Sequence, residues 1–259
     1  MLDFQKGSGL VGDAIRHSMM SVEVERKFVC NANSLKTLEE IGVCAGQDQF
    51  QDRYFDTPQF DLTLRDVWLR QRKGRWELKC PAATLRGAQE TRGERAEAAG
   101  LCTRYKEMTD AADIHRKLRE VLKDVGEKDK LATSECCHQK LTDPRGLGNA
   151  EMKCALEEGW ATDMNLLCFA EFTTVRRTFI WEEDGVHIDL DEADFGYRVG
   201  EIEVLIPEGG DVQAALDKIE RTAKKLGVTG DQVVDGKMSV YLQRNYPAHY
   251  ARLLSQHIL

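Results

Sequence analysis

Long apolar runs are missing from this sequence, and so are the cysteine patterns of disulfide or zinc frameworks. No segment approaches the roughly 18 apolar residues that a membrane-spanning helix needs. The N-terminal stretch has neither the apolar core nor the small-residue cleavage site of a secretory signal. The eight cysteines are scattered and form no CxxC pair, which is typical of reduced thiols. We therefore expect a cytoplasmic protein without a membrane partner.

An excess of positive charge is absent as well, because the formal net charge is -8 at pH 7. Proteins that bind nucleic acid through its phosphates usually carry a basic surface, so no nucleic-acid partner is expected. A polyanionic ligand would need a local basic cluster, metal ions, or both. No internal repeat or linker interrupts the 259 residues. We expect a monomer with a weakly ordered leader over 1–20 and a single domain over 21–259.

Alternation of apolar and polar residues predicts eight strands, with a tight hairpin turn at Lys73-Gly74. The predicted strands cover roughly 22–30, 49–57, 66–72, 75–80, 103–107, 170–181, 186–191 and 198–206. Helical periodicity is present at about 34–41, 109–124, 150–158, 211–227 and 236–254. The segment at about 83–101, rich in Ala, Gly, Arg and Glu, is predicted to be a surface-loop insertion.

Charged residues gather on one face of these strands, since alternate residues of a strand point to opposite faces. In the first strand, Glu23, Glu25 and Lys27 share a face, opposite Val22 and Val24. An ordinary half-solvated sheet would also alternate. Here, however, the charges are separated by type, with acidic pairs on some strands and an arginine pair on another.

This separation of charge indicates a chemistry. Two carboxylates two residues apart lie roughly 7 Å from each other on one face, a spacing that suits divalent-cation ligation. Paired arginines provide fork-shaped donors for phosphate. An antiparallel sheet of about eight strands can close on itself. The expected fold is therefore α+β, an eight-stranded closed antiparallel β tunnel with a charged interior and helices packed outside.

The order of the motifs adds a family resemblance. Glu23-x-Glu25-x-Lys27 is followed by DRYFDTP at 52–58, VWLRQRKGRWELKCP at 67–81, YKEMTD at 105–110, TTVRRTF at 173–179, VHIDLDEADFGYRVGEIEV at 186–204 and KMSVYLQRNYP at 237–247. From about residue 22 to 255 this series resembles the thiamine triphosphatases of the triphosphate tunnel metalloenzyme (CYTH) superfamily. The resemblance implies an enzyme that uses Mg²⁺ to hydrolyse thiamine triphosphate to thiamine diphosphate and phosphate.

The resemblance also implies roles for individual residues. The cations expected to bind the triphosphate are Lys27, Arg70, Arg72, Lys79, Arg176 and Lys237. The carboxylates expected around the metal are Glu23, Glu25, Glu107, Asp189, Glu201 and Glu203, although Glu23 and Glu107 could instead form salt bridges to tunnel cations. Asp191 and Asp194 are expected to shape the turn before Phe195-Gly196.

A Tyr54–Lys79 pair is implied as the catalytic base system, although Tyr54 could also serve only as a hydrogen-bonding group. Trp68 shares a face with Arg70 and Arg72, so it is the first candidate to contact the cationic ring of thiamine. Tyr105 and Met238 are the second candidates. The main alternative activity is that of an inorganic tripolyphosphatase. A nucleotide cyclase and a non-catalytic polyphosphate-binding module are further alternatives, and the acidic residues disfavour the binding module.

Overall fold

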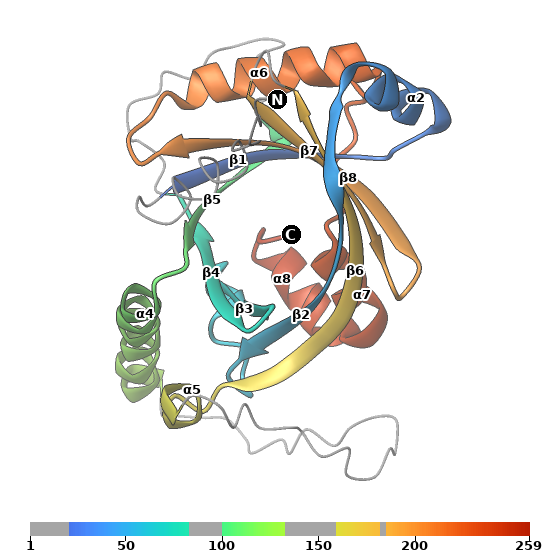
Figure 1. Cartoon of the computed structure of the whole chain (residues 1–259). Helices are drawn as coiled ribbons and strands as arrows, with labels where there is room; N and C mark the ends of the chain where they lie inside the picture. The colour runs from blue at the N-terminus through green and yellow to red at the C-terminus, as the bar shows by residue number, and fades with distance from the viewer. Residues whose placement is uncertain (1–20, 83–99, 133–158, 182–184) are drawn as a thin grey trace, which may run out of the picture.

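The protein forms a closed barrel in the computed structural model, which describes residues 21–82, 100–132, 159–181 and 185–259. The predicted leader at 1–20, nearly all of the predicted 83–101 insertion and the helix predicted at 150–158 lie outside these residues. Within the described part, the strands lie in the order β1-β5-β4-β3-β2-β6-β7-β8, and β8 pairs with β1 to close the ring (Figure 1). All neighbouring strands are antiparallel. The predicted closed antiparallel tunnel is confirmed.

The strands are β1 (Ser21–Phe28), β2 (Val43–Asp56), β3 (Trp68–Arg72), β4 (Arg75–Pro81), β5 (Cys102–Met108), β6 (Leu167–Trp181), β7 (Val186–Ala193) and β8 (Tyr197–Pro207). Strand β2 begins six residues earlier than the predicted residue 49. Residues 43–49 are exposed, so they lack the apolar alternation that marks a strand. Lys73 and Gly74 both have positive φ, of 51° and 75°, as a type I′ hairpin turn requires.

The apolar faces of the strands point outward and are covered by helices. Helix α6 (Val212–Leu226) and α2 (Ala32–Ile41) pack on one side, where Val24 and Ile202 belong to a shared core with Ile219. Helix α4 (Ala111–Ala132) and α5 (Gly159–Asp163) cover the opposite side, over Leu69 and Leu78. Figure 1 shows α6 and α2 above the barrel and α4 beside β4. The helices thus bury the apolar faces that the charged interior leaves outside.

The helical character predicted over 236–254 is confirmed but its continuity is wrong, because the structure has two helices there, α7 (Lys237–Asn245) and α8 (Pro247–Ser255). Pro247 lacks a backbone N–H and disfavours helical geometry at the residue before it. Tyr246 accordingly has φ -135° and ψ 58°, outside the helical region. A short helix, η1 (Thr63–Arg65), lies between β2 and β3, and its Thr63 contacts His249 of α8.

No described helix has the length and apolar character needed to cross a bilayer.

Candidate active site

A cavity of about 280 Å³ lies inside the barrel. It is lined by residues of β1 to β6 and β8, by the start of α7, and by Ile258 and Leu259 after α8. Many of the predicted site residues line it: Glu23, Glu25, Lys27, Tyr54, Trp68, Arg70, Arg72, Lys79, Tyr105, Arg176, Glu201 and Lys237. The structure therefore brings residues from seven strands and one helix into one polar chamber, as the alternation of each strand predicts.

Three further predicted residues are neighbours of lining residues. Asp189 accepts a hydrogen bond of 2.7 Å from Thr178 and forms an ion pair with Arg176. Glu107 lies 3.4 Å from the guanidinium of Arg70. Glu203 stands opposite Glu25 in the β1–β8 register. Together these three acids extend the charged interior along β5, β7 and β8.

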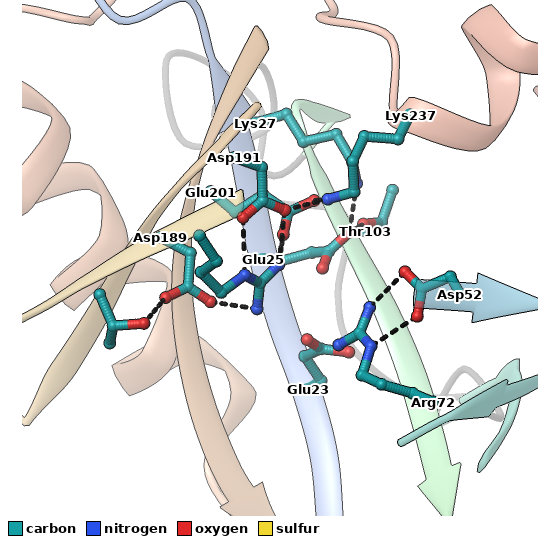
Figure 2. A network of polar contacts seen from close by, with 12 residues as sticks. Glu23, Glu25, Lys27, Asp52, Arg72, Thr103, Asp189, Asp191, Glu201 and Lys237 are labelled. Atoms are coloured by element: carbon teal, nitrogen blue, oxygen red, sulfur yellow. Dashed lines mark hydrogen bonds and ion pairs between the residues drawn. The ribbon is translucent and has the colours of Figure 1, made fainter. Parts of the chain in front are cut away.

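Each arginine of the chamber is held by a carboxylate from a neighbouring strand. Arg72 donates two hydrogen bonds, of 2.6 and 2.7 Å, to Asp52 (Figure 2). Arg70 donates one of 2.6 Å to Glu77, which lies opposite it on β4. The side chain of Asp52 is fully buried. These acids fix the direction of the guanidinium groups before any ligand arrives.

The lysines of the chamber are paired in the same way. Lys79 contacts Glu23, and its Nζ lies 3.9 Å from Glu25, while Lys27 contacts Glu25. Lys237, from α7, contacts Asp191 and lies 3.8 Å from Glu201. Figure 2 shows Lys27 and Lys237 converging on the acids of β1, β7 and β8. Each of these lysines is thus paired with at least one carboxylate of the interior.

Neighbouring acids of the interior differ in acidity. Burial disfavours the charged form of Glu25, but the ammonium groups of Lys27 and Lys79 outweigh it and lower its pKa to about 2. Burial, together with the charge of Glu23, raises the pKa of Glu203 well above its usual value. Burial also raises the pKa of Lys79's neighbour Glu23, against the attraction of that lysine. The carboxylates on this side of the chamber are therefore crowded, and a bound cation would relieve their repulsion.

A preformed metal cage is not part of this arrangement: no group of three or more acidic, His or Cys side chains in the described ranges is placed to hold an ion. The donors are nevertheless all carboxylate oxygens, the ligand type that Mg²⁺ prefers, and Mg²⁺ keeps several waters of its own. One or two carboxylates of the crowded set, such as Glu25 and Glu203, fit that requirement.

The two aromatic candidates share one partner that sequence reasoning missed. Trp68 Nε1 donates a hydrogen bond of 2.8 Å to Asp66, and the Tyr105 hydroxyl donates one of 2.9 Å to the same oxygen. Asp66 itself has a left-handed φ of 58° at the end of η1. The carboxylate therefore sets the orientation of both rings at the chamber wall.

Tyr54 lines the chamber, and its ring stacks on Phe172 with centroids 5.8 Å apart. Burial opposes the charged form of Lys79, but Glu23 and Glu25 outweigh it and raise the pKa of this lysine. Lys79 is thus a stable cation in contact with these acids. Its predicted catalytic partnership with Tyr54 stays a prediction.

A closed barrel whose interior pairs cations with carboxylates around a chamber is the architecture of a polyanion-binding tunnel. The chain belongs to the CYTH family, whose domain model matches residues 21–235. It is 36% identical over 235 residues to proteins named thiamine-triphosphatase from Macaca fascicularis and Homo sapiens. In both cases the match covers 90% of this chain and 89% of the relative.

Proposed function

We propose that this protein hydrolyses thiamine triphosphate to thiamine diphosphate and inorganic phosphate, with Mg²⁺ as its metal ion. The observation that carries the proposal is the set of six cations that converge on one chamber with an indole at its wall. These are Lys27, Arg70, Arg72, Lys79, Arg176 and Lys237, together with Trp68. The relatives that are 36% identical support the choice of substrate.

The chemistry follows from charge and position. Water attacks the terminal phosphorus, the bond from that phosphorus to the bridging oxygen breaks, and thiamine diphosphate leaves. The arginines and lysines neutralise charge on the phosphate oxygens, which is the main requirement of phosphoryl transfer. Tyr54 and Lys79, which both line the chamber, are the candidate pair that accepts the proton of the attacking water. Mg²⁺, held by one or two of the carboxylates, would supply further charge neutralisation.

Inorganic tripolyphosphatase activity is the second candidate function, because the cations that bind the phosphates do not depend on an organic group. What favours thiamine triphosphate is the apolar part of the chamber wall. It includes Trp68, Val234, Met238, Ile258 and Leu259. A tripolyphosphate ion, which is charged along its whole length, gains nothing from these side chains.

A substrate panel tests the proposal. Thiamine triphosphate, tripolyphosphate and ATP are incubated with the protein and Mg²⁺, and phosphate release is measured for each. We expect the highest kcat/KM with thiamine triphosphate and none of this turnover in excess chelator. A clear preference for tripolyphosphate would favour the second function, and full turnover in chelator would exclude the metal.

We further propose that the protein is a cytoplasmic monomer. Its substrate is a small molecule, and it binds neither nucleic acid nor membranes. The net charge of -8 supports the lack of a nucleic-acid partner. Sedimentation at several concentrations, with and without tripolyphosphate, tests the oligomeric state.

A further inference from the structure

Phe50 of β2 lies between two of the arginines that face the chamber. The guanidinium carbon of Arg72 is 4.0 Å from the centroid of its ring, and that of Arg176 is 5.6 Å away. Only 6% of Phe50 is exposed. The two arginines line the chamber, whereas Phe50 is not among the described residues that do so. The ring therefore contacts both cations without lining the chamber itself.

The strand register explains this placement. Strand β2 lies between β3 and β6. Asp52 is opposite Arg72 on β3, and Asp48 is opposite Arg176 on β6. Phe50 stands midway between these two acids on the same face of β2. It is therefore a diagonal neighbour of both arginines, at a separation that aromatic and long side chains can span.

Arg72 contacts both a carboxylate and an aromatic ring. Its Nε and Nη2 donate to Asp52, while its guanidinium carbon lies over the ring of Phe50. Arg176 donates to Asp191 and Glu201 and also forms an ion pair with Asp189. A guanidinium that contacts an aromatic ring as well as its carboxylates has less rotational freedom than one held by carboxylates alone.

We propose that Phe50 is a positioning residue that holds Arg72 and Arg176 in the orientation that receives the triphosphate. The inference rests on the proposed function, since it takes the phosphates as the anion that the arginines bind. The negative face of an aromatic ring attracts a cation, so one ring offsets part of the repulsion between two like charges. Phe50 acts through the arginines and does not touch the substrate.

The test measures binding of inorganic tripolyphosphate by calorimetry in the presence of Mg²⁺, independently of turnover. Phe50→Leu, which removes the ring, should weaken binding by about 3- to 30-fold. Phe50→Tyr keeps the ring and should bind within about twofold of the wild type. Because the ring supports the phosphate-binding arginines rather than thiamine, kcat/KM should fall by similar factors for tripolyphosphate and thiamine triphosphate.

A matched control lies on the outer face of β6. Phe179 is 1% exposed, and the guanidinium of Arg177 lies 5.2 Å from its ring. Phe179→Leu removes a buried ring beneath an arginine that does not line the chamber, so it reports the general cost of such a change. We expect it to leave tripolyphosphate affinity within about twofold of the wild type, an expectation that follows from its distance from the charged interior.

Coupling gives the second measurement. Arg72→Lys should weaken binding more in the wild type than in Phe50→Leu, since a lysine cannot stack its charge in the same planar way. If Phe50→Leu does not fold, Phe50→Met fills the space without a ring face and takes its place. Unchanged affinity in the ring-free variant, or an equal loss in Phe179→Leu, would overturn the positioning role. A wild-type protein that binds tripolyphosphate but hydrolyses no triphosphate would overturn the proposed function alone.

Discussion

Arg176 donates two hydrogen bonds, of 2.6 and 2.7 Å, to Asp191 on the adjacent strand β7. The expectation that Asp191 shapes the turn before Phe195 is therefore wrong: its fully buried carboxylate holds Arg176 and Lys237. Asp194, by contrast, connects the turn to β6, because its carboxylate accepts a hydrogen bond of 2.8 Å from the backbone N–H of Thr173. Asp191 thus belongs to the charged interior.

The neighbouring arginines Arg176 and Arg177 provide a matched pair for mutation. Arg176 faces the chamber, whereas Arg177 points outward and forms an ion pair of 3.1 Å with Glu39 of α2. Arg176→Gln should lower kcat/KM for thiamine triphosphate by about 100-fold, because a cation that stabilises the transition state is lost. Arg177→Gln should leave it within about twofold. Steady-state kinetics of both variants make the comparison, and equal losses would contradict the assignment of faces.

The residues that face the interior could be predicted from the sequence, because alternate residues of a strand point to opposite faces and the apolar residues mark the outer face. The pairing within the interior was not predictable in the same way. Asp52 and Phe50 share their face with Tyr54, so parity alone could have placed them in the tunnel. Which acid meets which arginine depends on the register between β2 and β3, and register is set by turns and bulges elsewhere in the sheet. The break at Tyr246 was readable, since Pro247 follows it.

Arg72 should contribute to stability as well as to binding. Its partner Asp52 is fully buried, so Arg72→Gln leaves a buried carboxylate without the two hydrogen bonds that the guanidinium donates. We expect a loss of about 1–3 kcal/mol in the free energy of unfolding, measured by urea denaturation. Adding Asp52→Asn to Arg72→Gln should restore part of it, because the unpaired charge is removed. A single variant as stable as the wild type would show that the pair is not needed for folding.

Tyr54 is the candidate base, and its hydroxyl is the only group that Tyr54→Phe removes. Since positioned bases contribute roughly 10²- to 10⁴-fold, this variant should lower kcat by about 100-fold and change KM little. The ring would keep its stacking on Phe172, so the melting temperature should not move. Single-turnover kinetics with thiamine triphosphate measure the chemical step directly. If kcat stays within about threefold, Tyr54 only packs against the chamber wall.

His249 makes the stability of the α8 contact depend on pH. Its ring stacks on Phe60 with centroids 3.9 Å apart, and Nε2 lies 2.9 Å from the Thr63 hydroxyl. Burial, assisted by Arg252, lowers the pKa of His249 to about 4. Since the ordinary histidine pKa is about 6.5, the unfolded chain binds a proton first as the pH falls. This contribution to stability is therefore complete above about pH 6.5 and is lost as the pH falls towards 4.

His249→Gln tests that linkage without touching the chamber. Urea denaturation at pH 7 and pH 5 should show a smaller loss of stability in the variant than in the wild type, by about 1–2 kcal/mol. Both proteins contain the other titrating groups, such as Asp56, whose pKa is raised to about 6 by burial. Subtracting the pH-dependent loss of stability of the variant from that of the wild type therefore removes their contribution. Equal pH dependence would mean that His249 titrates normally.

Trp68 separates the two candidate activities. Its indole lines the chamber on the same face of β3 as Arg70 and Arg72, and its Nε1 is held by Asp66 at 2.8 Å. A triphosphate bound by the arginines would therefore present its organic end near this ring. A cation on an indole face is worth about 0.5–2 kcal/mol, or roughly 2- to 30-fold in affinity.

Trp68→Ala should therefore lower kcat/KM for thiamine triphosphate by a factor in that range and leave tripolyphosphate turnover within about twofold, because the inorganic ion has no ring to lose. Trp68→Phe keeps an aromatic face but has no Nε1 donor, so its kcat/KM for thiamine triphosphate should lie between those of the wild type and Trp68→Ala. Tripolyphosphate serves as the internal control for damage to the arginines on the same strand. An equal loss with both substrates would mean that Trp68 positions Arg70 and Arg72, and the inorganic activity would then be the better description of this chamber.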